Sequence, residues 1–369
     1  MRFLILNTDY PSFLEWLYAS HPGLERQSYA AQAQVRNETM FGHADFCSTN
    51  LRKLGHEAWD IYVNNECAQK AWAREHGVRV PWQVRLRRGW VPWLSRRPWF
   101  SEILARQVAH YRPDVLLNLA IEGIPGEFLR SLKPHIRLLM GQHAAPLPAD
   151  DDIRCYELLL SSLPNQVDHF RKLGVRAELM RLAFEPRILE KLKLKTDGHK
   201  TAVSFVGSLD PDHQSRLQLL ERVCIRRDVE VWGPDVHGLP ESALTRRRYK
   251  GSAWGLGMYR VLNDSKITLN HHIDIAEQWA NNMRLFEATG VGALLLTDWK
   301  VNLNEIFEPG REVIAYRTPE ECDALIEYYL EHDEEREAIA RAGQQRTLRE
   351  HSYHARMQQV VDFAASSVS

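Results

Sequence analysis

The sequence predicts an α/β protein made of two Rossmann-like, doubly wound domains that face each other across a cleft. Two observations lead to this fold class. Apolar segments of strand length alternate with helix-like segments in two successive runs, a rhythm typical of parallel sheets covered by helices on both faces. The 369 residues are also enough for two domains of ordinary size. The polar segment 193–200 separates the runs and is the expected linker.

The first run makes up the predicted N-terminal domain, residues 1–195. Its first strand is expected at residues 3–6, and further strands at 58–63, 114–118, 136–140 and 158–161. Helices are expected at 46–54, 101–111, 124–132 and 165–173. Gly55 and Gly174 stop the first and the last of these helices.

The second run makes up the predicted C-terminal domain, residues 196–352. Strands are expected at 202–207, 229–233, 267–270, 293–297 and 313–316. Helices are expected at 213–223, at 257–262 and from Asn281 onward. Two further helices should end the chain. We assign the last of them, residues 353–369, to a segment separate from the C-terminal domain.

The composition excludes several classes of function. Lys and Arg number 47 against 48 Asp and Glu, so no overall basic field indicates a nucleic-acid partner. We find no apolar run long enough to span a bilayer, and the N-terminal apolar stretch is too short for a signal peptide. The five cysteines are scattered and form no CxxC pair, which indicates neither a disulfide framework nor a zinc site. We therefore expect a cytoplasmic protein.

Residues 72–100 interrupt the alternation with five tryptophans, seven arginines and three prolines. This segment has two interpretations. Its tryptophans pack on the N-terminal domain while its arginines extend outward, or it forms a contact surface for an anionic or glycan acceptor, a partner chain or the inner face of a membrane.

The most informative stretch is residues 281–292, where Arg284, Glu287 and Gly290 lie between a helix and an apolar strand. Nucleotides often bind where a helix meets the edge of a parallel sheet. There a glutamate accepts hydrogen bonds from a ribose diol and an arginine neutralises phosphate. An amphipathic helix with an internal salt bridge and a glycine stop explains the same spacing.

A series of short motifs between Ala202 and Arg356 gives this stretch a context. In order they are residues 205–208, His213 with Arg216, 231–233, 249–251, 258–259, 265–270 with His272, 282–288 with Gly290, 306–310, and 351–353 with Arg356. The set resembles the C-terminal domain of GT-B glycosyltransferases, most closely the group around the spore-maturation protein CgeB. The N-terminal half resembles this family only in layout.

The resemblance implies a nucleotide-sugar donor bound mainly by the C-terminal domain, an acceptor bound mainly by the N-terminal one, and a last helix that crosses back to the first domain. It implies that Glu287 binds the ribose hydroxyls, that Gly207 and Ser208 face the diphosphate, and that the turn ending at Gly251 lies near the base. Arg216, Lys266 and Arg284 are the candidates to neutralise the diphosphate. The full expected donor site comprises Gly207, Ser208, His213, Arg216, Gly251, Lys266, Asn270, Asn282, Arg284, Glu287 and Gly290.

The sequence departs from the family pattern at two places. Retaining members often carry a second glutamate eight residues before the first, where this chain has Trp279. They also often carry an arginine after the first glycine and a lysine shortly beyond. Here Ser208 takes the first place, and His213 or Arg216 must serve for the second. The stereochemical outcome is left open.

Catalytic candidates lie in the N-terminal half. His143 follows an expected strand, and the resemblance places it near the donor sugar. Glu122 follows another strand and is a candidate base for the acceptor hydroxyl, with Asp9 as a rival. The acidic segments 150–152 and 210–212 resemble metal motifs only weakly, so we expect no metal and no cofactor apart from the nucleotide sugar.

Two other functions are compatible with the same residues. One is a nucleotide-sugar epimerase of the same fold, although the segment 72–100 counts against it. The other is a two-domain protein that closes on a sugar without chemistry. We expect instead a metal-independent glycosyltransferase acting on a glycan, a protein or a small molecule.

Overall fold

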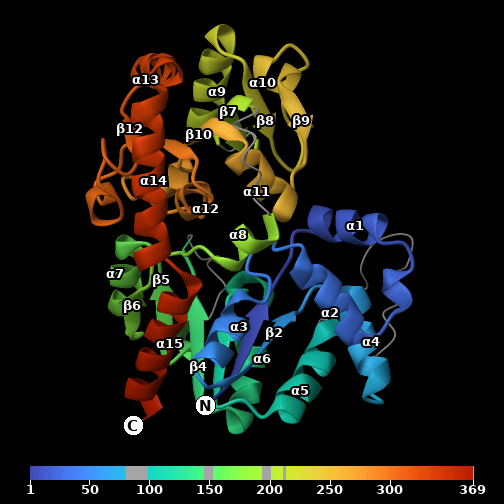
Figure 1. Ribbon diagram of the computed structural model, residues 1–369. Coiled ribbons are helices and arrows are strands. Elements are labelled where there is room, and N and C mark those ends of the chain that lie inside the picture. The colour runs from blue at the N-terminus through green and yellow to red at the C-terminus, as the bar shows by residue number, and fades with distance from the viewer. Residues whose placement is uncertain (80–98, 145–152, 193–200, 211–212, 369) are drawn as a thin grey trace.

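The computed structural model describes residues 1–79, 99–144, 153–192, 201–210 and 213–368. It contains two parallel six-stranded sheets, which confirms the predicted α/β class with two Rossmann-like halves. The first sheet lies before the expected linker and the second after it (Figure 1). The linker itself, residues 193–200, lies outside the described residues.

The first sheet has the strand order β2-β1-β3-β4-β5-β6. Its strands are β1 (Arg2–Asn7), β2 (Glu57–Tyr62), β3 (Val115–Asn118), β4 (Leu138–Gln142), β5 (Leu158–Ser161) and β6 (Ala177–Leu179). Its helices are α1 (Pro11–Ser20), α2 (Tyr29–Glu38), α3 (Phe46–Lys53), α4 (Glu66–Glu75), α5 (Trp99–Tyr111), α6 (Gly126–Leu132), α7 (Pro164–Lys172) and α8 (Arg187–Leu192). Strands such as β3 and β5 are buried along their whole length, which explains their continuous apolar sequences.

The second sheet has the order β12-β11-β10-β7-β8-β9. Its strands are β7 (Thr201–Val206), β8 (Val229–Trp232), β9 (Tyr249–Gly251), β10 (Ser265–Asn270), β11 (Leu294–Asp298) and β12 (Ile314–Tyr316). Its helices are α9 (Gln214–Arg226), α10 (Leu244–Arg247), α11 (Leu256–Asn263) and α12 (Arg284–Gly290). Three helices follow the last strand rather than the two expected: α13 (Pro319–Glu331), α14 (Asp333–Glu350) and α15 (Tyr353–Val368).

The last helix crosses back to the first half, as predicted. α15 lies beside α3 and β4, and both chain termini lie at the lower end of the first half in the view of Figure 1. At its start, Phe184 and Ser352 form a β-bridge, with Phe184 N donating to His351 O (2.8 Å) and Tyr353 N to Phe184 O (3.0 Å). We call this crossing point the hinge.

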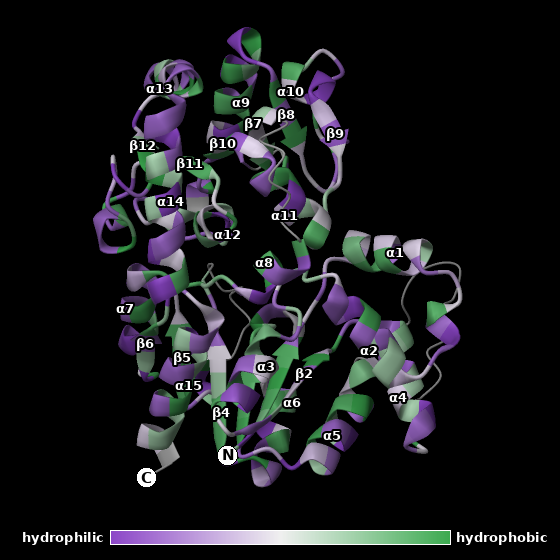
Figure 2. Ribbon diagram, in the orientation of Figure 1, coloured by the Kyte–Doolittle hydropathy of each residue, from purple (hydrophilic) through white to green (hydrophobic). Residues whose placement is uncertain are grey.

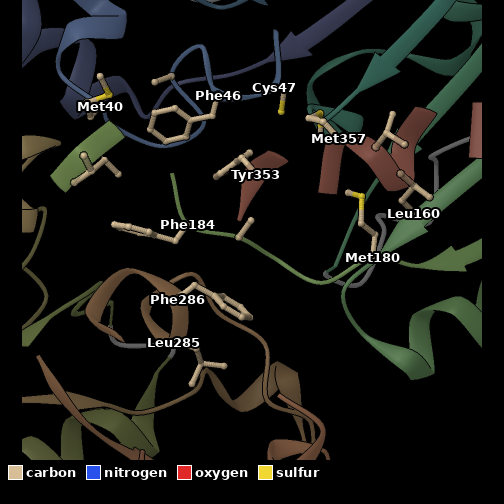
Figure 3. Packing of buried hydrophobic residues seen from close by; sticks show 14 of the residues in the cluster. Met40, Phe46, Cys47, Leu160, Met180, Phe184, Leu285, Phe286, Tyr353 and Met357 are labelled. Atoms are coloured by element: carbon tan, nitrogen blue, oxygen red, sulfur yellow. The ribbon is translucent and has the colours of Figure 1, made fainter. Parts of the chain in front are cut away.

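The largest apolar cluster runs through the hinge and belongs to both halves. In Figure 3, Phe184 lies between Phe286 of α12 and Tyr353 of α15, with Phe46 of α3 beyond. Two further clusters fill the outer faces of the two sheets. In Figure 2 the strands are predominantly hydrophobic, whereas hydrophilic residues are frequent on surface helices such as α14. Among the described residues, no helix has the length and apolarity needed to cross a membrane.

Candidate functional site

The candidate site lies at the carboxyl ends of β7, β10 and β11. In the second sheet β7 is flanked by β10 on one side and β8 on the other, so the strand order reverses there. Ligands of doubly wound sheets bind outside the carboxyl ends of the strands at such a point. Gly207 and Ser208 follow β7, and Asn270 ends β10, so the structure brings these predicted residues to one edge.

Arg284 and Glu287 form a buried ion pair. Their side chains are 13% and 7% exposed, and Arg284 Nη1 lies 2.7 Å from Glu287 Oε2. Arg284 Nε also donates to Val206 O at the end of β7 (3.0 Å), and Tyr259 OH donates to Glu287 Oε1 (3.3 Å). The salt bridge expected of an ordinary helix is therefore present, and it also connects α12 to β7 and α11.

Asn282 and Asn270 hold the start of α12 against the sheet. Asn282 Nδ2 donates to Asn270 Oδ1 (2.7 Å), while Asn282 Oδ1 accepts from Leu285 N (3.2 Å). Asn270 Nδ2 in turn donates to Thr297 Oγ1 of β11 (2.9 Å). The helix begins at Arg284, three residues later than the sequence suggested. Asn282 lies before this start, and its side chain accepts a hydrogen bond from Leu285 N in the first turn.

Arg216 joins the two turns that border the site. Its Nη1 donates to Ser208 O (3.0 Å), and its Nε and Nη2 donate to His271 O (3.2 and 2.9 Å). Burial lowers the pKa of Arg216 to about 10, so it is a cation at neutral pH. His213 directly precedes α9, three residues before Arg216, and its side chain makes no capping hydrogen bond to the helix.

Glycines let the backbone turns at this edge pack closely. A side chain at Gly233, at the end of β8, would overlap the carbonyl oxygen of Gly207. Gly251 ends β9 with φ of +116°, a conformation that favours glycine. Its carbonyl accepts from Gly233 N (3.2 Å), so the three glycines line the carboxyl ends of β7, β8 and β9.

Two predicted donor residues lie elsewhere. Lys266 is near the amino end of β10, where it pairs with Asp333 of α14 (3.3 Å), so the structure separates it from the carboxyl-end site. Gly290 ends α12 on the side of the hinge, where an added Cβ would lie 2.5 Å from the Phe184 ring. Close packing accounts for glycine at that position.

The structure adds residues that the sequence analysis missed. Asp298, the last residue of β11, accepts from the backbone N (3.0 Å) and Nδ1 (2.7 Å) of His272, and Lys300 Nζ lies 3.3 Å from it. Burial would raise the pKa of Asp298, but the His272 hydrogen bond and the surrounding cations hold it well below its usual range. Asp298 ends its strand as Asn270 does, and that signal could have identified it.

His143 and Glu122 lie together at the carboxyl end of the first sheet, where His143 follows β4 and Glu122 follows β3. His143 Nε2 is 3.6 Å from Glu122 Oε1; the histidine side chain is 10% exposed and the glutamate 56%. Asp9, the rival base, is buried, and both of its carboxylate oxygens accept from Arg36 of α2. Burial raises the pKa of Asp9, against the opposing effect of Arg36. Of the two candidate bases, Glu122 is therefore the exposed one and Asp9 the buried one.

The two halves meet in a pocket on the hinge side. Its lining includes Ser162, Arg181 and Leu182 from the first half and Asn281 and Glu305 from the second. Arg181 Nη2 pairs with Glu305 Oε2 across the junction (2.7 Å).

Two further predictions concern residues that are largely undescribed. Residues 80–98 of the Trp/Arg segment lie outside the described part of the chain, although Trp72 at its border is buried beside Ile103. Residues 150–152 and 211–212 of the acidic segments lie outside it too. Among the residues that are described, no three His, Cys, Asp or Glu side chains gather as a metal site would require.

Comparison with known structures identifies the class of fold. A glycosyltransferase from Rickettsia africae ESF-5 superposes with a TM-score of 0.62 at 10% identity, covering 100% of this chain and 98% of the other. HepE from Anabaena, solved with UDP-glucose, gives 0.60 at 11% identity, covering 99% and 100%. AviGT4, a glycosyltransferase of avilamycin A biosynthesis, gives 0.58 at 15% identity, covering 100% and 98%. The chain therefore has the GT-B fold.

The sequence comparison is more local. Residues 215–362 match the family described as glycosyl transferase-like. This match contains α11, α12, α9 from its second residue onward and much of the candidate site, so the similarity lies in the C-terminal part of the chain. No curated protein sequence matches the chain.

Proposed function

We propose that this protein is a glycosyltransferase that moves a sugar from a nucleotide-sugar donor to a glycan, protein or small-molecule acceptor. The observation that carries the proposal is the polar edge at β7, β10 and β11, which holds Arg216, Arg284 and Lys300; these three residues, β10 and β11 lie within the glycosyl transferase-like match. The Anabaena neighbour bound to UDP-glucose supports a donor of this class. Membership of the CgeB-like group is part of the proposal.

On the donor side, Glu287 is assigned to the ribose. A carboxylate has about four acceptor positions, and Arg284 and Tyr259 occupy two of those of Glu287. Arg284 uses Nε and Nη1 within the protein, which leaves Nη2 for the diphosphate. The cations Arg216 and Lys300 would share the leaving-group charge, so the proposed reaction needs no divalent metal.

On the acceptor side, the His143–Glu122 pair is assigned to proton transfer. The acceptor oxygen forms a bond to the anomeric carbon while the bond from that carbon to the diphosphate oxygen breaks. The electron pair leaves with the diphosphate, and the acceptor proton passes to Glu122. The proposal also places the protein in the cytoplasm, at or near the inner face of the membrane, because its cysteines are scattered and unpaired.

A panel of nucleoside diphosphates and nucleotide sugars tests this function. A matching ligand at about 100 times its dissociation constant should add roughly 2.7 kcal/mol to the free energy of unfolding. Glu287→Ala should abolish this stabilisation, whereas Arg222→Ala, on an exposed part of α9, should keep it. The proposal fails if no ligand of the panel stabilises the wild-type protein.

Turnover separates the alternatives. A transferase releases nucleoside diphosphate only when an acceptor is present, an epimerase interconverts the donor alone, and a binding protein does neither. Activity that persists in EDTA would support the metal-independent mechanism, and activity restored only by Mg²⁺ or Mn²⁺ would contradict it.

A further inference from the structure

The contact between the two halves extends beyond the hinge to Trp254. Trp254 belongs to the segment between β9 and α11 in the second half, yet its indole is buried against the first half. It lies 4.9 Å from the Phe41 ring and 5.8 Å from the Phe13 ring of α1, both edge-on. In Figure 1 the lower end of α11 meets α1, while the hinge lies beside α14 and α15.

The backbone shows that this contact is closely fitted. Leu256 N, the first residue of α11, donates to Thr39 O of the first half (2.8 Å). Gly255 has φ of +52°, and a side chain there would overlap the Thr39 carbonyl. The position therefore requires glycine for its conformation and for the close approach of the other half.

The same contact leads directly to the candidate site. α11 begins two residues after Trp254, and its first turn carries Met258 and Tyr259. Met258 Sδ lies 3.3 Å from Arg284 Nη1, and Tyr259 OH donates to Glu287. α11 is thus fixed to the Arg284–Glu287 pair, and the Trp254 contact aligns the first half with the donor edge to which this helix belongs.

We propose that Trp254 is a positioning residue, which keeps the first half in register with α11 and the donor edge. The proposal rests on the proposed function for its kinetic consequences, but not for its structural ones. Together with the hinge and the apolar cluster shared by both halves, the Trp254 contact would hold the ligand-free protein in the arrangement that transfer needs. Misplacing reacting groups by about 1 Å can lower a rate roughly a hundredfold.

Two variants remove the contact in different ways. Trp254→Ala removes the indole, and Gly255→Ala forces the segment away from Thr39 while keeping the indole. Trp59→Ala and Gly257→Ala are the matched controls: Trp59 packs on Tyr111 within the first half, and a Cβ at Gly257 meets nothing within 4 Å. Trp254→Phe keeps an aromatic ring at the contact and should retain most of the wild-type kcat and radius of gyration.

Small-angle scattering of the ligand-free protein gives the structural readout. The radius of gyration should increase in Trp254→Ala and Gly255→Ala and stay at the wild-type value in the controls. Kinetics give the second readout: kcat for transfer should fall by at least about tenfold in both variants, while the Kd for the nucleoside diphosphate changes by less than about threefold. A protein that was only destabilised would lose donor affinity as well.

Unchanged radius of gyration and unchanged kcat in both Trp254→Ala and Gly255→Ala would overturn the proposal. Failure of the wild-type protein to bind any nucleoside diphosphate would instead contradict the proposed function. The scattering comparison needs no ligand, so it decides the positioning role in either case. If Trp254→Ala does not fold, Gly255→Ala against its control Gly257→Ala makes the same comparison.

Discussion

Separating Arg284 from Glu287 is the sharpest test of the site's architecture. Arg284→Met keeps the length of the side chain but removes its charge. Among the described residues, the Glu287 carboxylate, 7% exposed, then keeps the Tyr259 hydroxyl alone as a hydrogen-bond partner. Breaking a buried pair on one side costs about 3–5 kcal/mol, because the remaining charge stays out of water without compensation.

Removing both charges should cost less than the sum of the single changes. Glu287→Leu alone leaves a guanidinium that is 13% exposed, and the double variant Arg284→Met/Glu287→Leu leaves neither charge. We expect a coupling energy of about 2 kcal/mol or more in the double-mutant cycle. The exposed pair Glu308–Arg311 has the same i,i+3 spacing with side chains 60% and 74% exposed, and its cycle should give less than about 1 kcal/mol.

Urea denaturation of the ligand-free protein, followed by circular dichroism, measures these free energies. The reasoning is refuted if Arg284→Met costs less than about 1 kcal/mol, or if the two single changes simply add. A small cost would mean that Arg284 contributes little to the folded state without ligand, and additive costs would mean that the Arg284–Glu287 pair itself does not stabilise it.

Three further changes have defined outcomes. Gly290→Ala places a Cβ 2.5 Å from the Phe184 ring, so calorimetry should show a loss of about 1–3 kcal/mol from overpacking at the hinge; an unchanged melting temperature would contradict the packing. Lys266→Ala should leave nucleoside diphosphate affinity unchanged in calorimetric titration, because this lysine lies near the amino end of β10, and a tenfold loss would restore the prediction from sequence. Burial, reinforced by the charge of Arg356, lowers the pKa of His351 to about 4. The unfolded chain then binds the proton more readily than the folded one, so the contribution of His351 to the free energy of unfolding is full above pH ~6.5 and falls by up to about 3 kcal/mol toward pH ~4. His351→Gln should flatten this part of the stability profile. An unchanged profile would show that His351 is not the group that causes the pH dependence.

The buried strands were predictable because burial requires a local apolar sequence, whereas the short edge strands β6 and β9 were missed, and β9 was expected to be a turn. β3 and β5 are short apolar runs between turn residues, and a fully buried parallel strand requires such a sequence. α1 and α2 were missed for the opposite reason. The buried residues of α2 are Gln32 and Arg36, and the apolar face of α1 packs against Trp254, more than 200 residues away in the chain. No local apolar period reveals either contact.

The site was predictable in position but not in its internal bonds. Residues that follow parallel strands gather at one edge, and Gly207, Asn270 and Asn282 do so. The same rule applied to Lys266 would have placed it at the opposite edge, since it precedes the apolar part of β10. The spacing of Arg284 and Glu287 fits a ligand site and a salt bridge equally well. The sequence does not show that both side chains are largely buried at the edge of the sheet.

Those two interpretations of the Arg284–Glu287 pair are compatible. A carboxylate that binds a ribose diol must be held in one orientation, and an oriented group loses less conformational entropy when the ligand arrives. Arg284 and Tyr259 hold Glu287 from two sides, and Asn282 holds the start of the helix that carries it. The conformational entropy of Glu287 and of the start of α12 is therefore already lost on folding, before any donor binds. The ion pair that explains the helix without a ligand is also the arrangement that a preorganised donor site requires.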